Sequence, residues 1–83
     1  MRKNVMPDDG VIRVGREKRR ASSVTIVYGL EARELSEVAS NLRKLCGTGG
    51  TAKNGVVELQ GDHRDKVVAW FTEAKRRVKR AGG

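Results

Sequence analysis

The residues with the clearest chemical potential lie between Cys46 and Lys53, where a thiol is followed by Gly-Thr-Gly-Gly-Thr-Ala and a lysine. A glycine-rich backbone of this kind can wrap an anion such as a nucleotide phosphate. A Walker loop, however, runs from a strand into a helix and ends in Gly-Lys-Ser/Thr. Here a predicted helix precedes the glycines, a predicted hairpin follows them, and Ala52-Lys53-Asn54 stands at the end. The pattern therefore favours a structural turn over a nucleotide site.

Two further groups could take part in catalysis. A phosphatase-type nucleophile at Cys46 would need an arginine six residues later, and that position holds Ala52. His63, with Asp62 and Asp65, falls in the first turn of a predicted helix, where Asp62 as N-cap accounts for the acids. One cysteine and one histidine also cannot build the usual metal cage or a disulfide. We predict no enzyme activity, no metal and no cofactor.

The charge balance points to a different kind of partner. The 83 residues include 18 Lys+Arg and 10 Asp+Glu, a formal charge of +8, and such a field attracts polyanions. The bases fall in two runs: Arg16, Lys18, Arg19 and Arg20, and then Lys75, Arg76, Arg77, Lys79 and Arg80. Because Tyr28, Trp70 and Phe71 are assigned to the core, we expect contacts to phosphate and RNA shape rather than base stacking.

Hydrophobic patterning predicts the elements that position these residues. Residues 1–10 read as a mobile leader that ends in a turn. Residues 11–14 and 23–29 predict two strands of a hairpin with a basic tip, with Val24, Ile26 and Tyr28 on one face. A helix is predicted from Glu31 to Cys46, because apolar residues recur there at helical spacing and Gly47 can end it.

The second half of the chain repeats this order. Asn54-Gly55 suits the positive φ angles of a two-residue turn, which predicts a hairpin of residues 51–53 and 56–60. A second helix follows Asp62, and its apolar stripe is Val67, Trp70, Phe71 and Ala74. Residues 76–80 form either a weak last strand or a basic tail, and Gly82-Gly83 is expected to be disordered.

This order predicts one α+β domain over residues 11–83, a two-layer α/β sandwich (α/β plait) with two helices on one face of a mixed, mostly antiparallel sheet. No stretch approaches the roughly 18–20 apolar residues that span a bilayer, so we expect a soluble, cytoplasmic monomer. The predicted core comprises Leu35, Val38, Leu42, Leu45, Val67, Phe71, Ile26, Val57 and Leu59.

The segment from Cys46 to Lys66 closely resembles the signature of the translation initiation factor 1 family of eukaryotes and archaea, the SUI domain. Its Gly-Gly-Thr, Lys-Asn-Gly and Gln-Gly-Asp-His-Arg elements stand in the same order, and the resemblance extends from about Val11 onward. The ending and Cys46-Gly47 look most like the bacterial homologues. The resemblance implies an α/β plait that binds the small ribosomal subunit near the P site and monitors pairing of start codon and initiator tRNA, without catalysis or cofactor.

The resemblance also implies site residues. The family's basic hairpin loop corresponds to Arg16, Lys18, Arg19 and Arg20, its second loop to Lys53 and Asn54, and its signature turn to Gln60, Gly61, Asp62 and Arg64. Glu17 interrupts the basic loop, a departure from the family's pattern. Partners implied are ribosomal RNA, initiator tRNA and other initiation factors. Two rivals stay open: a generic basic RNA-binding or interaction module on the same fold, and, less favoured, a small phosphohydrolase.

Overall fold

The computed structural model describes residues 10–81. The predicted leader before Gly10 and the predicted disorder of Gly82-Gly83 lie outside these residues. The elements follow in the order β1 (Ile12–Arg19), β2 (Ser22–Tyr28), a 3-10 turn (Ala32–Glu34), α1 (Leu35–Cys46), β3 (Gly50–Lys53), β4 (Val56–Gln60), α2 (Arg64–Glu73) and β5 (Val78–Arg80). Of the two alternatives for the basic C-terminal run, the strand is therefore the one that forms.

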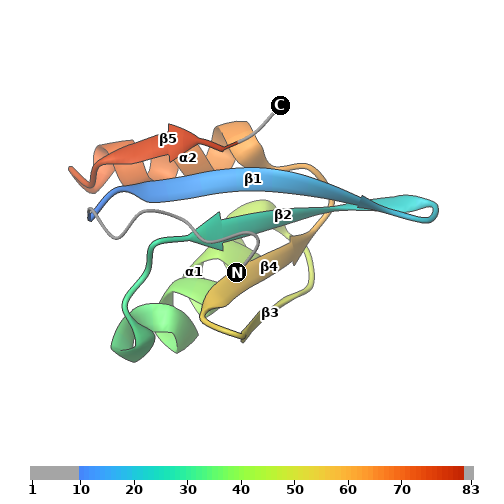
Figure 1. The fold of residues 1–83 in the computed structure, drawn as a ribbon, viewed down its shortest axis with the longest axis horizontal. Coiled ribbons are helices and arrows are strands. Elements are labelled where there is room, and N and C mark those ends of the chain that lie inside the picture. The colour runs from blue at the N-terminus through green and yellow to red at the C-terminus, as the bar shows by residue number, and fades with distance from the viewer. Residues whose placement is uncertain (1–9, 82–83) are drawn as a thin grey trace, which may run out of the picture.

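The strands form a single sheet in the order β3-β4-β2-β1-β5. Every neighbouring pair is antiparallel except β1 and β5, which run parallel. In Figure 1, α1 lies along the β3–β4 side of the sheet and α2 along the β1–β5 side. Residues of both helices join one core cluster with residues of β1, β2 and β4, so the predicted two-layer α+β plait is confirmed. Within residues 10–81, neither helix is long and apolar enough to cross a membrane.

Local signals set the limits of α1. Glu31 and Glu34 form a reciprocal capping box at the start of the 3-10 turn that leads into α1, in which the Glu31 backbone N–H donates to Glu34 Oε2 at 2.9 Å. At the other end Gly47 adopts a φ of 62°, a left-handed conformation that costs glycine little. Along the predicted range, the buried residues are Val38, Ala39, Leu42 and Cys46.

One core prediction on this helix is wrong. Leu45 is 40% exposed, whereas Cys46 is buried in the core. The stripe continues from Leu42 at a spacing of four residues, and Leu45, at a spacing of three, falls outside the contact with the sheet. Leu35 is only partly buried and packs against the core from its edge.

Strand register separates the two faces of the sheet, because directly paired residues of antiparallel strands share a face. Val14 pairs with Val27, and Val27 pairs with Val57, which places all three on the face that the helices cover. Thr25 and Leu59 form the next pair on this covered face, and both are fully buried.

The alternate residues of β2 lie on the opposite face, which we call the open face; it includes Arg13, Glu17, Arg19, Val24, Ile26, Tyr28, Val56 and Glu58. No element within residues 10–81 packs on it. Ile26 is buried as predicted, with 7% of its surface exposed, but it lies on the open face and outside the cluster under the helices. Apolar residues occupy both faces of β2 from Val24 to Val27, so alternation alone could not tell which face is covered.

The second helix buries a narrower stripe than predicted. Val67 and Phe71 are fully buried, while Trp70 is partly buried and meets the Phe71 ring edge-on at a centroid distance of 5.0 Å. Ala74 is exposed and lies just beyond the last helical residue. The fold thus rests on one core between the sheet and both helices.

Candidate RNA interface

The first basic run is not the loop that the sequence predicts. β1 continues through it to Arg19, which pairs with Ser22, so that only Arg20 and Ala21 form the turn. Arg20 adopts a φ of 47° there. The segment pairs because the Ser22–Val24 part of β2 offers a full antiparallel ladder, and backbone pairing overrides the polar composition of the β1 side.

Strand alternation divides the bases of this hairpin between two faces. Arg16 and Lys18 pair with Thr25 and Ser23 on the covered side, where they extend beyond the helices. Arg19 lies on the open face. Within the described residues Lys18 and Arg20 make no ion pair, and both are exposed.

Arg19 connects the first hairpin to β4. Its guanidinium lies 2.7 Å from Glu17 Oε1 and 3.3 Å from Glu58 Oε2. Hydrogen bonds to Glu58 and then to Glu17 raise the pKa of Arg19 further above its ordinary value. Lys53, in the second hairpin, approaches Glu58 Oε1 at 3.9 Å. Glu58 therefore holds bases of both predicted loops beside each other.

The second hairpin matches its prediction. Asn54 and Gly55 adopt φ angles of 53° and 79°, as a two-residue primed turn requires. The glycines before it have a packing role: a Cβ on Gly50 would lie 2.6 Å from the Glu58 carbonyl oxygen and 2.8 Å from Leu59 Cδ2. Cys46 is buried, and burial raises the pKa of its thiol. Both observations favour the structural reading over phosphate binding or thiol chemistry.

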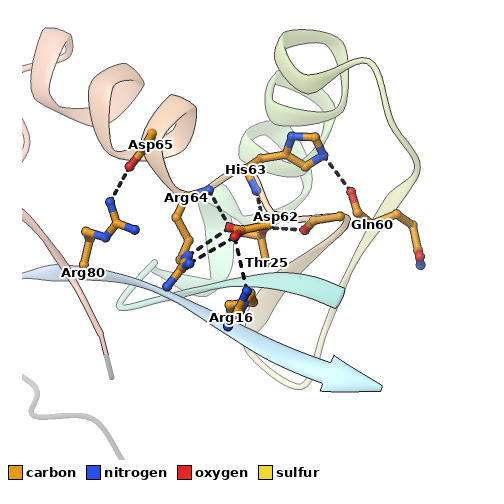
Figure 2. A network of polar contacts seen from close by, with 9 residues as sticks. Arg16, Thr25, Gln60, Asp62, His63, Arg64, Asp65 and Arg80 are labelled. Atoms are coloured by element: carbon orange, nitrogen blue, oxygen red, sulfur yellow. Dashed lines mark hydrogen bonds and ion pairs between the residues drawn. The ribbon is translucent and has the colours of Figure 1, made fainter. Parts of the chain in front are cut away.

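The signature turn, Gln60–Arg64, is organised by Thr25 (Figure 2). The buried hydroxyl of Thr25 donates to the Gly61 carbonyl oxygen at 2.6 Å and accepts the His63 backbone N–H at 2.8 Å. Gly61 has a φ of 92°, and a Cβ there would come within 2.8 Å of the His63 ring. The His63 Nε2 in turn contacts the Gln60 carbonyl oxygen at 2.8 Å.

Asp62 is not the N-cap that we predicted. The helix begins at Arg64, its N-cap is His63, and the His63 side chain makes no capping bond, although Asp62 Oδ1 accepts the Arg64 backbone N–H at a long 3.4 Å. Asp62 instead faces the Arg64 guanidinium, with Oδ1 2.9 Å from Nε and Oδ2 3.0 Å from the second terminal nitrogen (Figure 2). Arg64 lowers the pKa of Asp62 below its ordinary value. The Thr25 hydroxyl instead accepts the His63 N–H, and the helix begins one residue later than a capping Asp62 would place it.

Arg16 joins this turn to the first hairpin, since its guanidinium lies 3.6 Å from Asp62 Oδ2. Beside it, a hollow of about 300 Å³ opens at the start of α2. Its lining residues are Asp62, His63, Arg64, Asp65, Lys66 and Arg80. Arg80 of β5 is paired with Asp65, so the C-terminal basic run reaches the same region. The structure therefore connects all three predicted segments through Arg16–Asp62 and the contacts of Glu58.

Two residues that matter here were missed by sequence reasoning. Thr25 was read only as part of a β-branched run, although a polar residue between Val24 and Ile26 was a signal that its hydroxyl needs a partner. Tyr28 was assigned to the core, but it lies on the open face. No group of three or more His, Cys, Asp or Glu side chains within residues 10–81 could hold a metal ion.

The chain is a small basic α/β plait in which ion pairs connect the two hairpins and the signature turn. A model of the SUI1 translation initiation factor family matches residues 8–78, and the chain belongs to that family. Among individual relatives, the uncharacterized protein YciH of Escherichia coli is 40% identical over 79 residues, which cover 90% of this chain and 73% of YciH.

Archaeal relatives match as well. The protein translation factor SUI1 homolog of Pyrococcus furiosus is 44% identical over 74 residues, or 86% of this chain and 76% of the relative. That of Aeropyrum pernix is 48% identical over 63 residues, or 72% of this chain and 62% of the relative. The family resemblance read from the signature is thereby confirmed, on both its archaeal and its bacterial side.

Proposed function

We propose that this protein binds the RNA of the small ribosomal subunit in the cytoplasm during translation initiation, near the P site, where it monitors pairing between start codon and initiator tRNA. Membership of the SUI1 translation initiation factor family supports the first part. The second part extends the role implied by the signature from Cys46 to Lys66. No chemical step is required of the chain, because a factor of this kind acts by differential binding.

The observation that carries the proposal is the joining of the two hairpins and the signature turn by shared ion pairs. Arg16 holds Asp62, while Arg19 and Lys53 share Glu58. These contacts fix the positions of the hairpin bases relative to one another. Lys18 and Arg20, which make no ion pair with another described residue, are exposed at the end of the paired hairpin and are available for phosphates.

The test compares two matched double variants. Replacing Lys18 and Arg20 with alanine removes two hairpin bases; replacing Lys75 and Arg77 removes two exposed bases from the segment after α2. We expect the hairpin variant to weaken 30S binding and to lower the slope of log affinity against log salt by about 1 for each lost phosphate contact. The other variant should change the slope less. Equal effects would contradict the hairpin as the main contact.

Thermal melts of both variants provide the control for this experiment. Exposed substitutions usually change the free energy of unfolding by less than about 0.5 kcal/mol each, so both variants should melt near the wild-type temperature. A quadruple variant in which Arg16 and Arg19 are also replaced with alanine loses the ion pairs to Asp62, Glu17 and Glu58. We expect this quadruple variant to lose more 30S affinity than the hairpin double variant.

The monitoring role needs a separate measurement. Initiation complexes assembled on purified subunits with AUG and with a near-cognate codon should differ more in yield when the protein is present than when it is absent. An unchanged ratio, together with tight 30S binding, would reduce the protein to the alternative function of a general RNA-binding module. Comparable affinity for an unrelated RNA duplex would favour that alternative too.

A further inference from the structure

The open face contains a hollow that the proposed function does not use. It measures about 440 Å³ and lies over the middle of the sheet, on the side away from the helices. Its lining residues are Arg16, Glu17, Ile26, Tyr28, Asn54, Val56 and Glu58. They come from β1, from β2 and from the second hairpin, so the sheet itself positions them.

An aromatic ring and an apolar floor dominate the chemistry of this hollow. Tyr28 lies on β2, the central strand, and Ile26 and Val56 line the hollow with it. Gly15 of β1 leaves space beside the ring, since a Cβ there would lie 3.7 Å from Tyr28 Cε1 and 3.3 Å from the Ala81 carbonyl oxygen. Tyr28 makes no contact with the core beneath the helices and is left as the aromatic ring of the open face.

The charges around the hollow are compatible with a polyanion. Its two carboxylates already have cationic partners: Arg19 contacts both Glu17 and Glu58, and Lys53 approaches Glu58. Arg16 lines the hollow, but its guanidinium is paired with Asp62 on the covered side, and Arg13 lies opposite Tyr28 on β1. Partial burial and the two nearby carboxylates raise the pKa of Tyr28, so its phenol stays protonated and can donate a hydrogen bond near neutral pH.

We propose that this hollow binds one unstacked base of a single-stranded RNA segment, with the Tyr28 ring as the stacking platform. The Asn54 amide lines the hollow and can hydrogen-bond a base edge, and Lys53, beside Glu58, can contact a flanking phosphate. The inference takes RNA as the partner from the proposed function but adds a base contact to the phosphate contacts of the hairpin. It also replaces our expectation that the chain lacks a stacking residue.

The experiment uses two probes that carry the same phosphates. Fluorescence anisotropy measures the affinity of the full chain for a labelled hexacytidylate and for a six-unit ribose-phosphate strand without bases. One stacked base stabilises a complex enough to change its affinity by roughly 5- to 100-fold. We therefore expect the wild type to bind hexacytidylate about 10-fold more tightly than the abasic strand.

Two variants then locate the effect. Tyr28→Leu keeps an apolar side chain but removes the ring, and it should abolish the preference for the base-bearing strand. Tyr28→Phe is the matched control and should keep the preference. The salt slope should be equal in all three proteins, because the phosphate contacts are unchanged. Equal affinity of the wild type for both strands, or a preference that survives in Tyr28→Leu, would overturn the proposal.

Further readouts keep the outcomes separate. If Tyr28→Leu fails to melt cooperatively, methyl chemical shifts of Ile26 and Val56 in the wild type decide: they should move with hexacytidylate and not with the abasic strand. A chain that binds 30S subunits but shows no base preference refutes this inference alone. A chain with the base preference but no 30S binding refutes the proposed function alone. If neither strand shifts these methyl signals but an arginine-rich peptide does, the hollow belongs to a protein partner and the proposal is overturned.

Discussion

The two faces of the sheet are closed in different ways. On the covered face, aliphatic residues such as Val27 and Leu59 meet Leu42 and Phe71 of the helices. On the open face, Ile26 and Val24 are nearly as buried, yet no helix of the described chain lies over them. Their neighbours on that face are the paired charges of Arg19, Glu17 and Glu58. One strand, β2, therefore supplies Thr25 and Val27 to the covered face and Val24, Ile26 and Tyr28 to the open face.

The largest effect that separates the faces should come from paired truncations. Leu59→Ala opens a cavity under the helices and should cost about 3–5 kcal/mol, within the range for buried leucines. Ile26→Ala, on the adjacent strand and the open face, should cost less, because water and the long side chains of Arg19 and Glu58 can fill the space. Chemical denaturation of both variants measures the difference. Equal losses would show that the open face is as tightly closed as the core.

A smaller effect is expected at Thr25, the buried hydroxyl of the covered face. Thr25→Val keeps the shape but leaves the His63 N–H and the Gly61 carbonyl oxygen without this partner, at a cost of about 1–3 kcal/mol. Thr25→Ser keeps the hydroxyl and should lose less. Thermal melts of the two variants give the comparison, and 30S binding should fall only for the valine variant, since it alone loosens the signature turn.

The smallest effect concerns Asp62, which is largely exposed. Because it pairs with Arg64 and does not cap α2, Asp62→Asn should destabilise the fold by less than the roughly 0.5–2 kcal/mol that a lost N-cap costs. Its pKa is lowered in the folded protein, so its contribution is present above the ordinary carboxyl pKa and is lost as the pH falls through the lowered value.

The pH dependence gives the measurement. Melting temperatures of the wild type and of Asp62→Asn should differ by a constant amount between pH 5 and 7 and converge below the ordinary pKa of 3.8. A difference that persists in strong acid would contradict the ion-pair account. Glu34, whose pKa is lowered by Arg76, provides a second carboxylate with the same sign and serves as a comparison.

Much of the fold could be read from local signals. Helical spacing and Gly47 predicted the helix from Glu31 to Cys46, which the structure divides into the 3-10 turn and α1, and Asn54-Gly55 located the second hairpin. These features depend on residues close in sequence. The extent of β1 could not be predicted in this way, because its polar half is held by pairing with β2 and not by any preference of Arg16 to Arg19 for a strand.

The site was predicted in its parts but not in its connections. The basic residues and the signature turn were named from sequence, and the ion pairs Arg16–Asp62 and Arg19–Glu58 that join them are contacts between distant segments. Thr25 and Tyr28 were misjudged for one reason: the apolar run of β2 does not state which face the helices cover. A period-two pattern gives two equivalent faces until the rest of the chain is placed.

The parallel pairing of β5 with β1 also bears on how the chain is made. Ile12 pairs with Val78, and the Ile12 N–H donates to the Arg77 carbonyl oxygen at 2.8 Å. The side of β1 that faces away from β2 therefore has no strand partner until β5 is in place. Contacts between such distant segments are slow to form. During synthesis, the antiparallel part of the sheet can pair before β5 has been added, but the α2–β5 side cannot close until β5 is present. We therefore expect a nascent chain halted before Val78 to expose the β1 edge and to be cleaved by protease more readily than the full chain.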